Sequence, residues 1–464
     1  MSTQRKSTTR PAIRAASTAS TVAPPDAATP SGDGWSPGGG TGDGIWFRVT
    51  RELADDLAVD APARDRAGQT PYDEVARLQE AGLPGLLTPP GDDGRGSDWR
   101  AACAVIREIS AADSSVGELL AHHYLLSWAS HFFGQDPGTG SPARRKRTAE
   151  ASLGARAARE HWLLAGAVEP PPPGAGSGPG LTLTPSDDGW LLDGRRAFAS
   201  GVTVADRLVL AARPGGSGDA LVVLVDPACP GVFTDGGPDR VGQRLAGAGT
   251  VTFDRVPVAP ADVLGVLPQD EDTSAPFTTL APLALRLLLV HVGLGITEGA
   301  LAEARDVTRA GRAGHRAAPA GDPAARLAGA VRTVTTDDPY LPLAYGELAI
   351  EAHAAASVVE RADDALAYGL HTGRGLGAEQ RSAIGVLVAA AETVTGRAAV
   401  RVTTRVLELV DGAGGPAGHD GAPGFDRFWR NARALTARTR TAHRLRDIGD
   451  HYLHGTDTRL TLPA

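Results

Sequence analysis

The residue pattern of this chain changes twice along its length, from helical to β and back to helical. Residues 45–155 and 276–455 carry the apolar spacing of helices, whereas residues 165–265 carry short alternating runs broken by turn signals. A parallel α/β fold needs strands and helices that alternate one by one, and this order does not supply them. We therefore predict an α+β, mainly α, protein in which a small all-β unit separates two helical parts.

The helical parts show where single helices begin, end and bury a face. Pro71 opens one helix and Gly82 closes it, because proline suits the first turn and glycine the position after the last. Leu285–Ile296 is apolar nearly all round, which is typical of a buried helix, and Ile384–Val410 is a long helical run. A further helix buries one face through Ala102, Val105, Ile106 and Ile109.

Four segments follow from these patterns. We predict a disordered tail over 1–43, a helical domain over 44–160, a β domain over 161–270 and a helical bundle over 271–464. The tail is rich in Ser, Thr, Ala, Pro and Gly and lacks the apolar core of a secretory signal, so a transit peptide is the weaker alternative. We expect the protein to be cytoplasmic.

Composition excludes several classes of protein. The net charge of −8 argues against a strong basic footprint for nucleic acid. No run of about 18 uninterrupted apolar residues occurs, which argues against a membrane span. The two cysteines, Cys103 and Cys229, are too few for a disulfide scaffold or a four-cysteine metal site. We predict neither a nucleic-acid nor a membrane partner.

Two clusters invite a functional interpretation that their details weaken. The glycine cluster Asp411–Pro416 follows a helix, lacks G-x-G-x-x-G spacing and has no lysine, so a helix-to-helix loop is favoured over a phosphate loop. His122 and His123 point about 100° apart on a helix. Neither has a metal ligand four residues on, so we predict no metal site and one pocket-facing histidine.

The segment Phe425–Arg433 is dense in aromatic and guanidinium groups, and more arginines follow it. This composition fits a nucleic-acid surface. It fits equally the phosphate of a cofactor near the glycine cluster. The residues themselves leave the choice open.

Short motifs follow one another in a set order between about residues 45 and 455. They are Asp98-Trp99-Arg100, Ile106–Ile109, Asp188-Gly189-Trp190, Phe198–Gly201, Gly242-Gln243-Arg244, Thr252–Val258, Tyr345-Gly346-Glu347 and Phe425–Arg433. Together they resemble the acyl-CoA dehydrogenase superfamily, and within it the flavin-dependent monooxygenase branch typified by dibenzothiophene monooxygenase. The resemblance implies a helical N-terminal domain, a middle β-barrel or β-sandwich and a C-terminal four-helix bundle, with flavin bound at their junction.

The resemblance also provides a test of the activity. Dehydrogenases of this superfamily abstract a proton with a glutamate whose usual position falls near Thr439. No Asp or Glu occurs from Arg427 to Arg446, or in the stretch Thr273–Thr297 that supplies the base in other members. Because proton abstraction needs a base within reach, the sequence favours a monooxygenase over a dehydrogenase.

The monooxygenase branch implies reduced FMN delivered by a separate flavin reductase, O₂, and a small apolar or heteroatom-bearing substrate. By resemblance, Phe198 and Ser200 lie along the flavin ring, and Ser200 donates a hydrogen bond. His123 matches the pocket histidine, and Arg444 matches a cation at the flavin phosphate. Further candidates for cofactor contact are Arg312, Gly412 and Gly414.

Two positions depart from the branch. Its asparagine in a Gly-Asn-Ala motif is Gly166 here, which has no side chain to orient bound oxygen. Its catalytic histidine after the Arg-Asn motif is Arg438, which cannot act as an acid or base near neutral pH but can stabilise negative charge. His443, about one turn further on, is a possible substitute.

Two alternatives stay open. An FAD-dependent acyl-CoA dehydrogenase would bring Glu347 or Asp426 near the flavin. A scaffold that has lost catalysis would hold no flavin and would fill the cavity with Arg438. The superfamily's assembly implies a homodimer or homotetramer, with the Ile384–Val410 helix in the interface.

Overall fold

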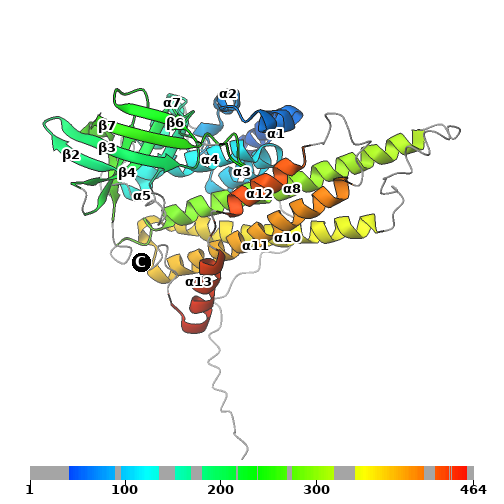
Figure 1. Cartoon of the computed structure of the whole chain (residues 1–464). Coiled ribbons are helices and arrows are strands. Elements are labelled where there is room, and N and C mark those ends of the chain that lie inside the picture. The colour runs from blue at the N-terminus through cyan, green and yellow to red at the C-terminus, as the bar shows by residue number, and fades with distance from the viewer. Residues whose placement is uncertain are drawn as a thin grey trace, which may run out of the picture. The chain divides into compact units, whose positions relative to one another are not determined.

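The architecture is a helical N-terminal part, a mixed β-sheet and long C-terminal helices (Figure 1). The computed structural model describes residues 41–88, 96–134, 152–168, 180–215, 218–237, 239–268, 274–317, 340–411, 424–437, 439 and 441–456, and leaves out the side chains of 41–43, 310–317 and 411.

Helix α2 begins and ends where the sequence predicts, and a side chain caps the start of α3. Helix α2 starts after Pro71, and Gly82 stops it in the left-handed conformation at φ 70°. The Asp98 carboxylate caps α3 by accepting from the Ala101 N–H at 2.9 Å. The elements of this part are α1 (Thr41–Ala67), α2 (Tyr72–Glu80), η1 (Leu83–Gly85), α3 (Trp99–Ala112), α4 (Ser114–Ser127), α5 (Ala129–Phe133) and α7 (Leu153–Arg159).

The sheet has the strand order β6-β7-β3-β2-β4-β5-β8, and β1 pairs with β4 off this path. The β1–β4 and β2–β4 pairs are parallel and the others antiparallel. The bounds are β1 (Leu164–Ala167), β2 (Thr182–Ser186), β3 (Gly189–Phe198), β4 (Arg207–Pro214), β5 (Ala220–Val225), β6 (Val232–Gly236), β7 (Gly249–Val258), η2 (Pro260–Asp262) and β8 (Val263–Leu267).

Strand β4 shows how the sheet joins the helices. Leu208 and Leu210 point into the core of the β domain, whereas Val209 between them packs into the helical core. Side chains alternate across a strand, so a strand that is apolar at every position buries both faces. Strand β5 repeats the pattern, with Val222 on the helical side and Val223 on the β side.

The C-terminal helices are α8 (Leu280–Ala317), α10 (Leu341–Thr372), η4 (Gly373–Gly375), α11 (Ala378–Asp411), α12 (Asp426–Thr436) and α13 (Thr441–His454). Helix α8 lies against α3 at close range because two of its glycines face that helix. A Cβ on Gly295 would lie 2.5 Å from the Arg107 carbonyl oxygen, and one on Gly299 would lie 2.1 Å from that of Ala111. The predicted fold is confirmed.

Two of these helices are long and apolar enough, by composition alone, to cross a membrane. They span Leu280–Arg309 and Ala378–Val410, with mean hydropathies of 1.8 and 1.4 over their most apolar windows. Of those windows, 78% and 50% are buried inside the protein. Helix α8 is therefore a core helix, as its all-round apolar pattern predicts.

Candidate functional site

The segment that ends β3 is held from two sides. Phe198 pairs with Gly249 of β7 and is 6% exposed. The Gly201 N–H donates to the Ala246 carbonyl at 2.7 Å. Gly201 has φ 80°, and a Cβ there would lie 2.6 Å from the Ala165 Cβ, so only glycine fits. Ser200 is thus fixed between the end of β3 and strand β1.

Two hydroxyls of this region, those of Ser200 and Thr203, are buried without a hydrogen-bond partner among the described residues. Ser200 is 2% exposed, and its Oγ has no hydrogen-bond partner among the described residues. A buried polar atom without a partner costs about 1–3 kcal/mol. A ligand can supply the missing partner, so the Ser200 hydroxyl fits a cofactor with hydrogen-bonding atoms.

His123 lies on α4 beside the same strand. Its Nε2 lies 2.9 Å from the Pro84 carbonyl oxygen, and the Leu164 N–H lies 3.0 Å from its Nδ1. A carbonyl can only accept and an N–H can only donate, so these partners fix the tautomer with the proton on Nε2. Burial lowers the pKa of His123 to about 4, so the ring is neutral.

His123 and the segment that carries Ser200 therefore contact adjacent residues of β1. His123 bonds to Leu164, and the glycine after Ser200 packs on Ala165. Both histidine nitrogens are occupied by backbone groups, so the ring as it stands fastens α4 to β1 and η1. A catalytic role for His123 stays a prediction.

Gly166, the first departure from the branch, lies in β1 opposite Val209 of β4. Its φ is 135°, and a Cβ there would lie 2.1 Å from the Val209 carbonyl oxygen. The local backbone thus has no room for an asparagine at this position. At Gly166 the backbone of β1 packs closely on β4, so the missing side chain leaves no gap.

The loop Gly242–Ala246 accepts a hydrogen bond from Gly201, the residue after Ser200, and its contacts could not be predicted from the sequence. Gln243 has φ 54°, which is unusual for a residue with a side chain. Its N–H donates to the Asn431 Oδ1 of α12 at 2.7 Å, and its Oε1 accepts from the Ser114 Oγ of α4 at 3.0 Å. The sequence contains the Gly-Gln-Arg and Arg-Asn motifs, but nothing in their spacing indicates that they meet.

Arg444 lies on α13 in a half-buried ion-pair cluster. Its Nε lies 3.0 Å from the Glu392 Oε2 of α11, the oxygen to which Arg286 Nη2 of α8 donates at 2.6 Å. His443 is exposed. The structure thus does not bring Arg444 and His443 into contact with Ser200 or His123. Arg438, Gly412, Gly414 and the Arg312 side chain lie outside the described residues.

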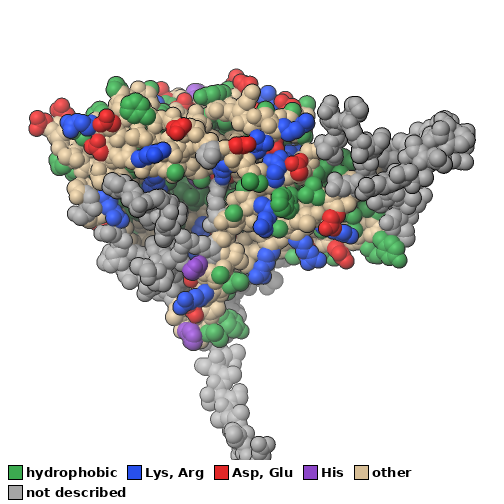
Figure 2. Space-filling view, viewed as in Figure 1, with side chains coloured by type: hydrophobic (Ala, Val, Ile, Leu, Met, Phe, Trp, Pro, Cys, Tyr) green, Lys and Arg blue, Asp and Glu red, His purple; other side chains and the backbone are tan. Residues whose placement is uncertain are grey.

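The arginine-rich segment Phe425–Arg433 docks α12 onto the rest of the chain. Phe428 is buried, and the Arg427 guanidinium lies 4.1 Å above its ring. Arg427 pairs with Glu303, and Arg430 pairs with Asp65. Arginine and acidic side chains are interspersed on the face shown in Figure 2. These two guanidinium groups therefore have intramolecular partners.

The two carboxylates of which a dehydrogenase would bring one near the flavin, Glu347 or Asp426, both lie on the surface. Glu347 of α10 is exposed. The Asp426 side chain is 61% exposed and pairs with Arg430 at 2.9 Å. Neither contacts the segment around Ser200.

Comparison with known proteins decides the family. Residues 47–137 match the model for the acyl-CoA dehydrogenase N-terminal domain. A solved complex of dibenzothiophene monooxygenase from Paenibacillus sp. A11-2 with FMN and indole is 30% identical, with a TM-score of 0.74, covering 89% of this chain and 98% of that one. This chain belongs to the acyl-CoA dehydrogenase superfamily.

Two curated relatives place this superfamily member in the monooxygenase branch. The probable FMNH₂-dependent monooxygenase SfnC of Pseudomonas putida is 28% identical over 412 residues, covering 88% of this chain and 94% of the relative. The dibenzothiophene monooxygenase of Rhodococcus qingshengii is 29% identical over 419 residues, covering 88% and 93%. The predicted class, a flavin-dependent monooxygenase, is confirmed over the dehydrogenase.

Proposed function

We propose that this chain is the oxygenase of a two-component system, which takes reduced FMN from a separate flavin reductase and uses O₂ to oxidise a small substrate. Reduced FMN supplies two electrons, so that one oxygen atom enters the substrate and the other leaves as water. The observation that carries this proposal is the buried, unpartnered Ser200 hydroxyl beside Phe198 at the end of β3. The relatives named above support FMN over FAD.

The roles of the chain's own residues follow from their positions. Ser200 donates to the flavin, and Phe198 lies along its ring. His123 stays neutral and holds α4 against β1, which excludes water from that wall of the site. Gly166 offers no side chain to bound oxygen, so orientation must come from other groups of this chain.

The proposed substrate is small and apolar or carries sulfur or nitrogen. Dibenzothiophene, a sulfur heterocycle, and indole, a nitrogen heterocycle, occur in the names of two relatives. Both are flat and apolar, which suits a site walled by buried apolar strands and helices.

Anaerobic titration with reduced FMN, followed by rapid mixing with O₂, tests the function. We expect a tight complex, and then a transient flavin species that differs spectrally from reduced and oxidised FMN. Absence of FMN binding would overturn the proposal. Binding of FAD that is bleached by an acyl-CoA would point to the dehydrogenase instead.

Ser200→Ala tests whether the buried Ser200 hydroxyl contributes to flavin binding. We expect about tenfold weaker binding of reduced FMN, because one neutral hydrogen bond is lost. Thr50→Val is the matched control, since Thr50 on α1 is also 2% exposed and its hydroxyl also lacks a partner among the described residues. Both variants should fold at least as stably as wild type, and only Ser200→Ala should lose affinity.

We also propose that the chain forms a homodimer or homotetramer. Helix α10 exposes Leu343 at 62% and Ile350 at 69%, one heptad apart, and α13 exposes Tyr452 at 87%. Apolar side chains of this size gathered on one side of a helix mark an interaction surface. Sedimentation of Ile350→Glu should show a smaller species than wild type, whereas Val59→Glu, at an apolar residue of α1 that is 82% exposed, should not.

A further inference from the structure

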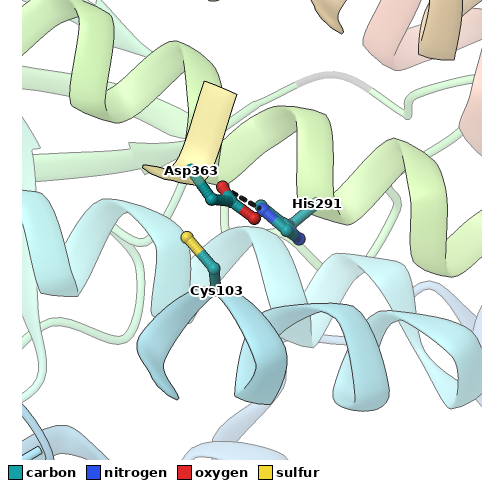
Figure 3. A group of neighbouring side chains, drawn as sticks. All are labelled: Cys103, His291 and Asp363. Carbon is teal, nitrogen blue, oxygen red and sulfur yellow. Dashed lines mark hydrogen bonds and ion pairs between the residues drawn. The ribbon is translucent and has the colours of Figure 1, made fainter. Parts of the chain in front are cut away.

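A second cluster of reactive side chains lies inside the helical core. Cys103 of α3, His291 of α8 and Asp363 of α10 point toward one another (Figure 3). One potential ligand atom from each residue lies within 4.8 Å of the other two. Cys103 and His291 are each 3% exposed, and the Asp363 side chain is 15% exposed.

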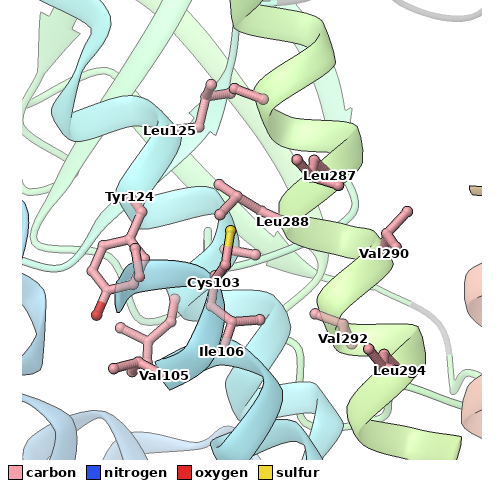
Figure 4. Packing of buried hydrophobic residues seen from close by; sticks show 14 of the residues in the cluster. Cys103, Val105, Ile106, Tyr124, Leu125, Leu287, Leu288, Val290, Val292 and Leu294 are labelled. Atoms are coloured by element: carbon pink, nitrogen blue, oxygen red, sulfur yellow. The ribbon is translucent and has the colours of Figure 1, made fainter. Parts of the chain in front are cut away.

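The surroundings of this cluster are apolar. Cys103 lies among Ile106, Leu287, Leu288 and Val290, which belong to the same buried core (Figure 4). Ionisable groups in such surroundings are paired, neutralised or bound to a metal, because an isolated charge there is expensive. The proposed oxygenase function uses none of the three.

The imidazole and the thiol of this cluster both lie close to the Asp363 carboxylate. The His291 Nε2 lies 2.8 Å from the Asp363 Oδ1. The Cys103 Sγ lies within 4.8 Å of a ligand atom of each of these two residues. The thiol and the imidazole both converge on one carboxylate, and a cation can replace their protons.

The other ring nitrogen of His291, Nδ1, can carry the ring proton when a metal binds Nε2. The His291 Nδ1 is buried and has no hydrogen-bond partner among the described residues. No neighbour therefore holds it unprotonated, and the ring proton can move from Nε2 to Nδ1, which leaves the Nε2 lone pair for a metal.

We propose that Cys103, His291 and Asp363 form a binding site for a divalent metal ion of the zinc type. Thiolate, imidazole and carboxylate are the ligands that Zn²⁺ takes in proteins, and three ligands leave a fourth position for water. Binding displaces the thiol proton. Two anionic ligands and one divalent cation then form a neutral unit, which suits a buried position.

Three features of the fold support this site. The ligands come from three long helices, so their relative positions are set by the packing of α3, α8 and α10 rather than by loops. The partly exposed Asp363 provides the path to solvent. Arg107, the cation of α3 that acts on Asp363, is held by Glu298 at 2.7 Å and so does not displace the ion.

Cobalt titration of the whole, tag-free and metal-free chain tests the proposal. We expect one Co²⁺ per chain, with the visible bands of tetrahedral cobalt and a thiolate-to-cobalt charge-transfer band, and we expect Zn²⁺ to displace it. No flavin is present in this experiment, so its outcome is independent of the proposed function.

Variants assign the signal to the cluster. Cys103→Ser should remove the charge-transfer band, and Cys103→Ser, His291→Gln and Asp363→Asn should each weaken Co²⁺ binding at least tenfold. Cys229→Ser, at the half-buried second cysteine, should bind as wild type does.

Thermal unfolding provides a second readout. Zn²⁺ should raise the Tm of wild type and of Cys229→Ser but not of Cys103→Ser, because only a site present in the folded state stabilises it. Cobalt spectra without a thiolate band, or a band lost in Cys229→Ser rather than in Cys103→Ser, would overturn the proposal. So would the absence of cobalt binding.

Discussion

The Asn431 side-chain oxygen accepts a hydrogen bond from the backbone N–H of Gln243 at 2.7 Å. This bond ties α12, near the end of the chain, to the loop that follows β6. In the same loop, the Ala246 carbonyl accepts a hydrogen bond from the N–H of Gly201, the residue after Ser200. A residue far along the sequence thus fixes the backbone at the proposed flavin site.

Asn431→Ala should destabilise the protein by about 2 kcal/mol. The substitution leaves the buried Gln243 N–H without an acceptor, and it removes the bond of 2.9 Å from Asn431 Nδ2 to the Ser114 Oγ. Urea unfolding measures the change in the free energy of unfolding. Arg433→Ala, at an exposed position of the same helix, is the control. An equal decrease in the free energy of unfolding in the two variants would show that the Asn431–Gln243 hydrogen bond does not contribute measurably to stability.

Gly166→Asn, which restores the residue of the monooxygenase branch, should destabilise rather than repair. The φ of 135° is unfavourable for any side chain, and the new Cβ would lie 2.1 Å from the Val209 carbonyl oxygen. These effects together cost on the order of 3 kcal/mol or more.

Gly236→Ala in β6 is the matched control, because a Cβ there has open space. We expect the melting temperature of Gly236→Ala to stay near that of wild type and that of Gly166→Asn to fall well below it. A Gly166→Asn protein as stable as wild type would mean that β1 can adopt an ordinary strand backbone.

The sequence predicted the layout of the fold because local patterns determine it. Pro71 and Gly82 bound a helix through backbone preferences that act over one turn, and the continuous apolar runs of β4 and β5 follow from burial on both faces. The absence of Asp and Glu from Arg427 to Arg446 and from Thr273–Thr297 also favours a monooxygenase over a dehydrogenase on the sequence alone.

The contacts between distant motifs could not be predicted in this way. The pairing of Gln243 with Asn431 depends on where two loops and a helix meet, and no periodicity encodes it. The cluster of Cys103, His291 and Asp363 was missed for the same reason, since each residue is isolated in sequence. The arginines of Phe425–Arg433 suggested a ligand, but Arg427 and Arg430 are bound to carboxylates of the chain itself.

Arg444→Gln should weaken binding of reduced FMN by about 10- to 100-fold and leave the affinity for reduced riboflavin unchanged. The reason is that riboflavin lacks the phosphate beside which the family resemblance places Arg444. Anaerobic titration with both flavins measures the ratio of affinities. Arg446→Gln, whose side chain is 75% exposed two residues on, is the control. Equal losses for the two flavins would assign Arg444 to its ion pair with Glu392 alone.

His123 should make the protein sensitive to acid below pH 6.5. Burial lowers its pKa from the model-peptide value of 6.5 to about 4 in the fold. Between these values the unfolded chain binds a proton that the folded chain excludes. The contribution of His123 to stability is therefore complete above pH 6.5, and on the order of 3 kcal/mol of it is lost as the pH falls toward 4.

His123→Gln should be less stable than wild type at pH 7 but should lose less stability on acidification. His353→Gln, at an exposed histidine, should follow wild type. Urea unfolding at several pH values measures these differences, and parallel profiles for wild type and His123→Gln would contradict the assignment of a neutral, backbone-bound ring.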